Sequence, residues 1–138
     1  MTLKNLTTGL AALGAVFIIY VGIAYLLAPQ SSASGFGVPT WPSEDGTAFL
    51  AVKGVRDIAS GLVIFALLLN GHRKALGWAM AAITFVPTGD MVIVLGHDGS
   101  AGTAFGIHGL TAVAVAVTAG LLLRERSTTT QSDRTVTI

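Results

Sequence analysis

Five ionisable side chains that interrupt otherwise apolar stretches are the clearest candidates for chemistry in this chain: Lys53, Arg56, Asp57, Asp90 and His108. The first three stand together in 53-KGVRDIASG-61, directly before an uncharged run that reaches Gly71. Carboxylates and imidazoles exchange protons, and lysine and arginine stabilise negative charge. The set could therefore perform acid–base chemistry if the fold brings its members together.

Composition places these residues in a membrane protein. The chain has 138 residues, 52% hydrophobic and 11% charged, with a mean hydropathy of +0.73. Average soluble domains carry about 25% charged residues, so this chain has too little polar surface to cover an apolar core. The net charge of +1 gives no reason to expect a nucleic-acid partner. The lack of cysteine excludes disulfides, thiolate metal sites and thiol redox chemistry.

Four segments are long and apolar enough to cross a bilayer, at about residues 8–28, 45–70, 74–96 and 103–123. They predict an all-α, multi-pass four-helix bundle in the cell membrane, formed by residues 1–126, with 127–138 as a disordered polar tail. The first segment also resembles a signal peptide, with Lys4 before it and small residues after it. Its length favours a retained helix.

Lysine and arginine predict the orientation of the bundle. They flank the first helix, join the second to the third and follow the fourth: Lys4, Arg73, Lys74, Arg124, Arg126 and Arg134. The other two connections contain acidic residues and His97 but no lysine or arginine. We therefore expect both termini in the cytoplasm. The outer connection 29–46 is rich in proline and glycine, which argues against regular structure, and it is either an interfacial linker or a lid.

Helix length decides whether the charges lie in the membrane. The uncharged run 58–71 has fourteen residues, and as a helix it measures about 21 Å, short of the roughly 30 Å of hydrocarbon. The second span must therefore include Asp57. With the predicted orientation, the ionisable residues of three helices share one layer about 5–15 Å below the outer boundary. Tyr20 and Tyr25 reach similar depths.

Spacing predicts how the charges of this layer meet. Lys53 and Asp57 are four residues apart and can pair directly. We expect Asp90 to meet Arg56 or Lys53 between helices, with His108 adjacent, because an unpaired charge in a bilayer is costly.

Proline also shapes the third predicted helix. Pro87 is expected to kink it and to open a cavity near Asp90, with Thr84 or Thr88 bonding to the freed carbonyl groups.

Three interpretations of the layer remain open. It is a structural ion network that fixes helix register, or a cofactor-free enzyme site for a lipophilic substrate, or a site for an anionic ligand coupled to proton transport. Four helices are few for a transporter, so the last interpretation requires a homo-oligomer. The catalytic candidates are Asp57, Asp90 and His108. The ligand-binding candidates are Lys53, Arg56, Tyr20, Tyr25, Ser60 and Trp41. The set His97, Asp98, His108 and Asp90 fits no standard metal motif, and we expect no metal or cofactor.

The motif 53-KGVRD-57, an aspartate late in the third helix and a histidine early in the fourth resemble a family of short four-helix membrane proteins found in bacteria and fungi. That family is catalogued as a domain of unknown function, and the resemblance covers about residues 8–123. The architecture is more distantly similar to the DoxX-like group. The resemblance implies a four-helix fold and no established reaction. Fungal members look like accessory proteins of natural-product pathways, which favours the enzyme interpretation.

Overall fold

The computed structural model describes residues 2–125, and its regular structure within that range is helical throughout. The elements are α1 (Leu3–Leu27), α2 (Pro29–Ser34), the 3-10 helix η1 (Glu44–Gly46), α3 (Thr47–Leu69), α4 (Arg73–Ile83), α5 (Phe85–Gly96), α6 (Ala101–Thr103), the π-helix η2 (Ala104–Gly109) and α7 (Leu110–Arg124). The tail predicted over residues 127–138 lies outside the described residues.

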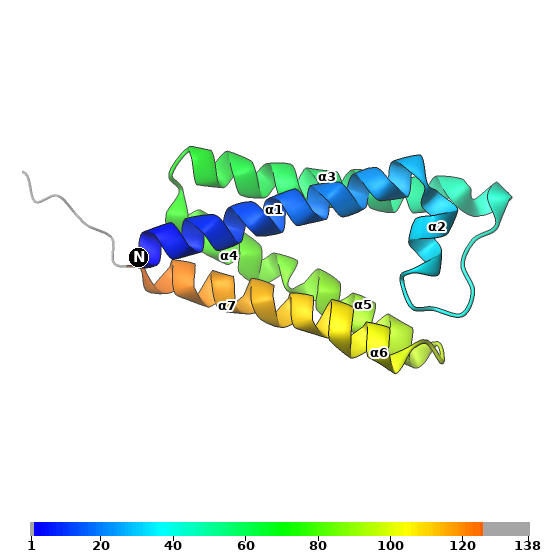
Figure 1. Ribbon diagram of the computed structural model, residues 1–138. Coiled ribbons are helices and arrows are strands. Elements are labelled where there is room, and N and C mark those ends of the chain that lie inside the picture. The colour runs from blue at the N-terminus through cyan, green and yellow to red at the C-terminus, as the bar shows by residue number, and fades with distance from the viewer. Residues whose placement is uncertain (1, 126–138) are drawn as a thin grey trace, which may run out of the picture.

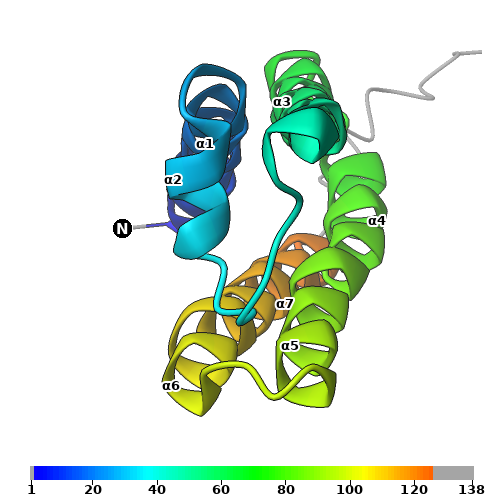
Figure 2. The ribbon, with the colours of Figure 1, turned by 90° about the vertical axis from the view of Figure 1, so that its right-hand side faces the viewer.

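The long helices form two layers (Figure 1). In one layer α1 packs along α3, and in the other α4 and α5 run beside α6, η2 and α7. The layers meet at the end that holds the N-terminus, the α3–α4 turn and the end of α7, and they diverge toward α2. Viewed along the bundle, the segment after α2 crosses from one layer to the other (Figure 2). We call the two ends the narrow end and the wide end.

The hydrophobic core lies at the narrow end. Small residues on α1 and α7 let the layers approach there, and larger side chains of α3 and α4 fill the remaining space. The buried cluster comprises Ala11, Ala15, Ile64, Leu76, Met80, Ala119 and Leu122. Since this cluster ends where the layers diverge, the wide end is left without a comparable packed core.

Glycines bring α1 and α3 into backbone contact. A Cβ atom added at Gly22 would lie 2.6 Å from the carbonyl oxygen of Gly54, and one at Gly54 would lie 2.6 Å from the carbonyl oxygen of Gly22. Any side chain at either position would therefore push the helices apart. This close approach fixes the face of α3 that carries Asp57, one turn beyond Gly54, against α1.

The third predicted helix is divided at Thr84 into α4 and α5. Pro87 has no N–H to donate to the carbonyl group four residues earlier, and its ring crowds that group. The hydroxyl of Thr88 donates to the Thr84 carbonyl at 2.8 Å, and the hydroxyl of Thr84 donates to the Met80 carbonyl at 3.0 Å. The predicted interruption of the helix is confirmed, three residues before the proline. The carbonyl group that Pro87 frees is that of Ile83, and the two hydroxyls bond to other carbonyl groups, so this part of the prediction was wrong.

The connection 29–46 contains more regular structure than its composition predicts. Pro29 opens α2 at a first-turn position, where its missing N–H costs nothing. Glu44–Gly46 forms η1 just before α3. The prediction that proline and glycine exclude regular structure from this connection was wrong, because proline terminates one helix and begins the next.

Three helical stretches are long and apolar enough to cross a membrane: Leu3–Leu27, Arg73–Gly96 and Ala101–Arg124. α3 has 23 residues but includes Lys53, Arg56 and Asp57. Large apolar side chains also cover the outward faces of the helices, including Leu13, Trp78, Val92 and Val113. An outer surface of this kind suits lipid rather than water, and the chain is accordingly a small membrane protein.

The glycine contact generates a stability prediction. Gly54→Ala should lower the free energy of unfolding by about 1–3 kcal/mol, because the new methyl group overlaps the α1 backbone. Thermal unfolding in detergent micelles would measure the change. Gly9→Ala is the matched control on α1, since a Cβ there meets nothing within 4 Å. Equal stability of the two variants would contradict the close packing of α1 on α3.

Candidate functional site

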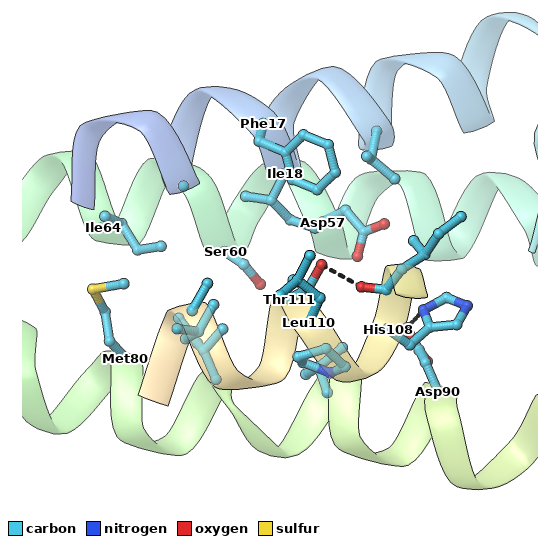
Figure 3. Close-up of a pocket in the computed structure, with 18 of the residues that line it drawn as sticks. Phe17, Ile18, Asp57, Ser60, Ile64, Met80, Asp90, His108, Leu110 and Thr111 are labelled. Atoms are coloured by element: carbon cyan, nitrogen blue, oxygen red, sulfur yellow. Dashed lines mark hydrogen bonds and ion pairs between the residues drawn. The ribbon is translucent and has the colours of Figure 1, made fainter. Parts of the chain in front are cut away.

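A cavity of about 610 Å³ lies between the two layers, beyond the core cluster (Figure 3). Most of its lining is apolar and comes from α1, α3, α4, α5, η2 and α7. Representative lining residues are Leu10, Phe17, Ile64, Met80, Ile83 and Val115. A space of this size and character suits a lipophilic molecule.

The wide part of this cavity collects ionisable side chains from four elements. Its lining includes Tyr25 of α1, Lys53 and Asp57 of α3, Asp90 of α5 and His108 of η2. Ser60 and Thr111 also line it. The fold therefore brings together ionisable side chains from the second, third and fourth apolar segments of the chain. A tyrosine from the first segment joins them.

The predicted pair of Lys53 and Asp57 is present. The ammonium nitrogen lies 2.6 Å from Asp57 Oδ2, and Asp57 is only 6% exposed. The same ammonium lies 4.7 Å from the centre of the Tyr25 ring and 5.8 Å from that of Phe36. Lys53 is thus held by a carboxylate and by the negative faces of two aromatic rings.

His108 is positioned by the π-helix η2 and by the connection after α2. Wide turns of this kind are rare and often occur at functional sites. The imidazole Nε2 lies 2.8 Å from the carbonyl oxygen of Phe36, and the two rings are 4.7 Å apart between centres. A carbonyl oxygen only accepts hydrogen bonds, so Nε2 carries the hydrogen.

The other imidazole nitrogen faces Asp90. Nδ1 lies 3.9 Å from Asp90 Oδ2. Since Nε2 already bears a hydrogen, a neutral imidazole would direct its Nδ1 lone pair at the carboxylate, and the contact would be repulsive. One further proton, on Nδ1 or on the carboxyl group, makes the contact attractive. The two groups therefore face each other as an acid and a base in electrostatic contact, at a distance longer than a hydrogen bond.

Asp90 is less well satisfied than the other acidic side chain of the cavity. Among residues 2–125, no donor lies within hydrogen-bonding distance of its carboxyl group, and His108 is the nearest cationic partner. The lining position of Asp90 makes its carboxyl group accessible to a ligand.

The cavity opens sideways between α1 and α7. Leu13 and Phe17 on one side, and Ile107 and Leu110 on the other, line the cavity and are also 68%, 48%, 51% and 66% exposed, respectively. Such residues mark the rim of an opening. In a membrane this rim would face lipid tails, which gives an apolar molecule a lateral route inside.

The connection after α2 crosses the wide end of the bundle (Figure 2), and Gly35 and Phe36 contribute to the cavity lining there. The Ser100 N–H donates to the Gly37 carbonyl at 2.9 Å, and this bond ties the connection to the opposite layer. The Trp41 indole N–H donates to Gln30 Oε1 at 2.8 Å. Of the two forms expected for 29–46, this arrangement is closer to a lid.

Three ligand-binding candidates lie outside the cavity lining. Tyr20 is 67% exposed on α1, Arg56 is exposed on α3, and Trp41 lies on the connection. Among the side chains that the structure describes, Arg56 has no ion-pair partner within 4.0 Å, and Asp90 contacts His108 rather than Arg56. His97 bonds to the Ile93 carbonyl, and the described residues bring no three histidine or acidic side chains together as a metal site would require.

Phe36 is a site residue that sequence reasoning did not name. It lies against His108 and near Lys53. The signal was its position between two glycines, 35-GFG-37. Gly37 has φ +105°, which only glycine adopts easily, and a Cβ there would collide with Thr103.

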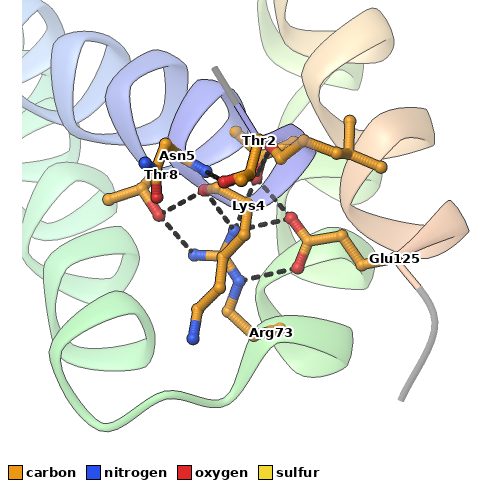
Figure 4. Close-up of polar contacts among 8 residues, drawn as sticks. Thr2, Lys4, Asn5, Thr8, Arg73 and Glu125 are labelled. Carbon is orange, nitrogen blue, oxygen red and sulfur yellow. Dashed lines mark hydrogen bonds and ion pairs between the residues drawn. The ribbon is translucent and has the colours of Figure 1, made fainter. Parts of the chain in front are cut away.

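A second polar cluster holds the layers together at the narrow end (Figure 4). The Arg73 guanidinium donates to Glu125 Oε1 at 2.6 Å and to Oε2 at 2.9 Å. It also donates to the hydroxyls of Thr7 and Thr8 on α1, at 2.5 and 2.9 Å. The fully buried Thr7 hydroxyl bonds to Glu125 in turn. This cluster ties α1, α4 and the end of α7, and sequence reasoning used Arg73 only for orientation.

The family model of a domain of unknown function, DUF4267, matches residues 15–122. The chain belongs to this family. The matched range contains the whole ionisable part of the cavity lining, from Tyr25 to His108. The resemblance to an uncharacterised family is therefore confirmed. The searches of curated proteins and of solved structures found no match.

In this DUF4267 protein the narrow-end cluster predicts an acid-sensitive stability. The Arg73 hydrogen bonds hold the pKa of Glu125 below its ordinary value. The stabilisation is then fully present above the unfolded-state pKa of about 4.3 and is lost as the pH falls through the lower folded-state pKa. Thermal unfolding between pH 7 and pH 3 should show a decline below about pH 4.3. A Glu125→Gln variant should decline less steeply, and an identical profile would contradict this account.

The two acidic residues of the DUF4267 cavity should differ in their contribution to stability. Asp57→Asn removes the carboxylate partner of Lys53 and should lower the free energy of unfolding by about 1–3 kcal/mol. Asp90→Asn removes no hydrogen bond and should change it by less than about 1 kcal/mol. Chemical unfolding in micelles would measure both variants. A larger loss for Asp90→Asn would indicate that Asp90 is a structural residue.

Proposed function

We propose that the chain is a multi-pass membrane protein with four spans, α3 included, and with its narrow end in the cytoplasm. A helix of 23 residues is about 35 Å long, enough to cross the hydrocarbon. Pairing removes much of the cost of Lys53 and Asp57, and the long side chain of Arg56 can reach the outer interface. The narrow end carries Lys4, Arg73, Lys74 and Arg124, which favours the cytoplasmic side.

We infer that the wide-end cavity is the site of acid–base catalysis on a lipophilic substrate. The observation that carries this inference is that a carboxyl group and an imidazole, those of Asp90 and His108, face each other at 3.9 Å at the wall of a mostly apolar cavity. A general acid or base needs a group that holds a proton next to the reacting atom. An apolar surrounding strengthens the electrostatic effect of such a group.

Each polar residue of the cavity has a distinct part in this proposal. Asp90 and His108 exchange a proton with the substrate, and the Phe36 carbonyl fixes the orientation of the imidazole. Lys53 and Asp57 neutralise each other and position the neighbouring rings. Isomerisation and cyclisation need no reactant besides the substrate and a group that moves protons, and hydration needs one water molecule in addition, so the proposed reaction belongs to this class.

The two other interpretations are less well supported. A network that merely fixes helix register would pair each charge, as Arg73 and Glu125 are paired, whereas Asp90 faces the cavity without a hydrogen bond from residues 2–125. Transport requires access from both sides of the membrane. The core cluster and the Arg73 cluster close the narrow end, which argues against a passage in this conformation.

The proposal predicts a change in the lipid-soluble metabolites of cells that make the protein. Asp90→Asn should lower formation of the protein-dependent product by about 10²–10⁴-fold, the usual contribution of a general acid or base. Mass spectrometry of lipid extracts, compared at equal protein levels, would measure it. An Asp90→Asn protein that forms the product at the wild-type rate would exclude the acid–base proposal.

Gly14→Phe tests the cavity in the same experiment. Gly14 lines the cavity and a Cβ there meets nothing within 4 Å, so a phenyl ring fits into the space that the substrate would occupy. Product formation should fall as far as with Asp90→Asn. Gly9→Phe is the matched control, because Gly9 is equally open but does not line the cavity. Normal product formation by Gly14→Phe would exclude the cavity as the site.

A further inference from the structure

The side chains that line the cavity carry a negative formal charge, because Arg56 does not belong to the lining. The charged side chains that line it are Lys53, Asp57, Asp90 and His108. With a neutral imidazole they sum to one positive and two negative charges, and with one further proton on the Asp90–His108 pair they sum to zero. Arg56, which balanced the charges in the sequence, is exposed outside the lining. The cavity therefore cannot gain a net positive charge without a second added proton.

The uncompensated negative charge lies on Asp90. Lys53 is already 2.6 Å from the carboxylate of Asp57 and lies over the Tyr25 ring, so its charge is largely neutralised. Among the described residues, Asp90 has one basic side chain within 4.0 Å, the imidazole at 3.9 Å, and Lys53 acts on it only from a longer distance. An anionic ligand would meet Asp57 and Asp90 before it met an available cation. A cationic group would meet an accessible carboxylate and the faces of Phe36 and Tyr25.

We propose that the cavity takes a lipophilic molecule that carries, or gains from the Asp90–His108 pair, a positive charge, and that it rejects carboxylates. This proposal rests on the proposed function, in which the cavity binds a lipophilic substrate, and it adds the charge of that substrate. The positive group lies beside Asp90, and the apolar part extends toward Ile64 and Met80 (Figure 3). From Lys53 to Ile64 the cavity follows α3 for about 16 Å.

The proton balance follows from this placement. A basic atom of the substrate forms a bond to the proton that the pair held, and the bond from that proton to the imidazole or carboxyl group breaks. The pair is left with one negative charge and the substrate with one positive charge, so the cavity stays neutral. A ligand that is already cationic instead displaces the shared proton to water. Binding of such a ligand therefore releases a proton and weakens as the pH falls.

The groups that face the pair set this pH dependence. They are His108 from η2, Lys53 and Asp57 from α3, and Tyr25 from α1, which lies within electrostatic reach of Asp57 and Asp90. Each proton that is added to the pair removes one negative charge from the cavity, so the attraction for a cation weakens as protons are added.

Photolabelling in lipid nanodiscs tests the proposal with three probes of one chain length. They are dodecylamine, dodecanol and dodecanoate, each with a diazirine in the alkyl chain. Adducts on the cavity residues Ile64, Met80 and Thr118 would be counted by mass spectrometry. Adducts on the lipid-facing residues Trp78 and Val113 in the same sample correct for the different amounts of probe in the bilayer.

We expect the corrected labelling of the cavity by the amine to exceed that by the carboxylate by about tenfold or more, which corresponds to about 1.4 kcal/mol. Asp90→Asn should bring this ratio near unity while labelling by dodecanol is unchanged. Lowering the pH from 8 to 5 should reduce amine labelling in the wild type and leave dodecanol labelling unchanged. Gly14→Phe should reduce labelling of the cavity by all three probes, and Gly9→Phe is again the matched control.

Two kinds of failure are distinguishable. If none of the three probes labels the cavity above the lipid-facing reference, both the proposed function and the charge selectivity are wrong. If dodecanol labels the cavity but the carboxylate labels it as well as the amine does, the cavity binds lipophilic molecules and the charge selectivity alone is wrong. An amine preference that persists in Asp90→Asn would also overturn the role of Asp90.

Discussion

An ionised side chain that is buried among apolar groups must be neutralised by a partner, and most features of this protein follow from that requirement. Lys53 and Asp57 meet it within one helix, four residues apart. Arg73 and Glu125 meet it between helices, with two threonine hydroxyls completing the cluster. Asp90 meets it only through a distant imidazole. The quality of pairing therefore separates groups that stabilise the fold from a group that is available for chemistry.

The two ends of the bundle have opposite organisation. At the narrow end small residues, a packed core and the Arg73 cluster hold the layers together. At the wide end the layers are joined by the connection after α2, and the space between them remains open. A site with a cavity depends on both ends, because rigid packing at the narrow end holds the helices at a fixed separation at the wide end.

Sequence reasoning recovered the features that depend on length and spacing. Spacing of four residues predicted the pair of Asp57 with Lys53, and helix length predicted that Asp57 lies within one long helix, α3. That α3 crosses the membrane stays a prediction. Pro87 predicted the interruption between α4 and α5. The partner of Asp90 could not be derived in this way, because rotation of each helix about its axis decides it. That rotation depends on contacts such as the one between Gly22 and Gly54, and on the π-helix that holds His108.

The hydrogen bond between His108 and the Phe36 carbonyl has a consequence for how such a site diversifies. A backbone oxygen in a connecting segment selects the imidazole tautomer, so the protonation chemistry of the site depends on the path of that segment. Gly35 and Gly37, which flank Phe36, determine this path. A change of length or sequence between α2 and α3 would move this carbonyl group. The imidazole of His108 could then adopt its other tautomer, while the long helices stay unchanged.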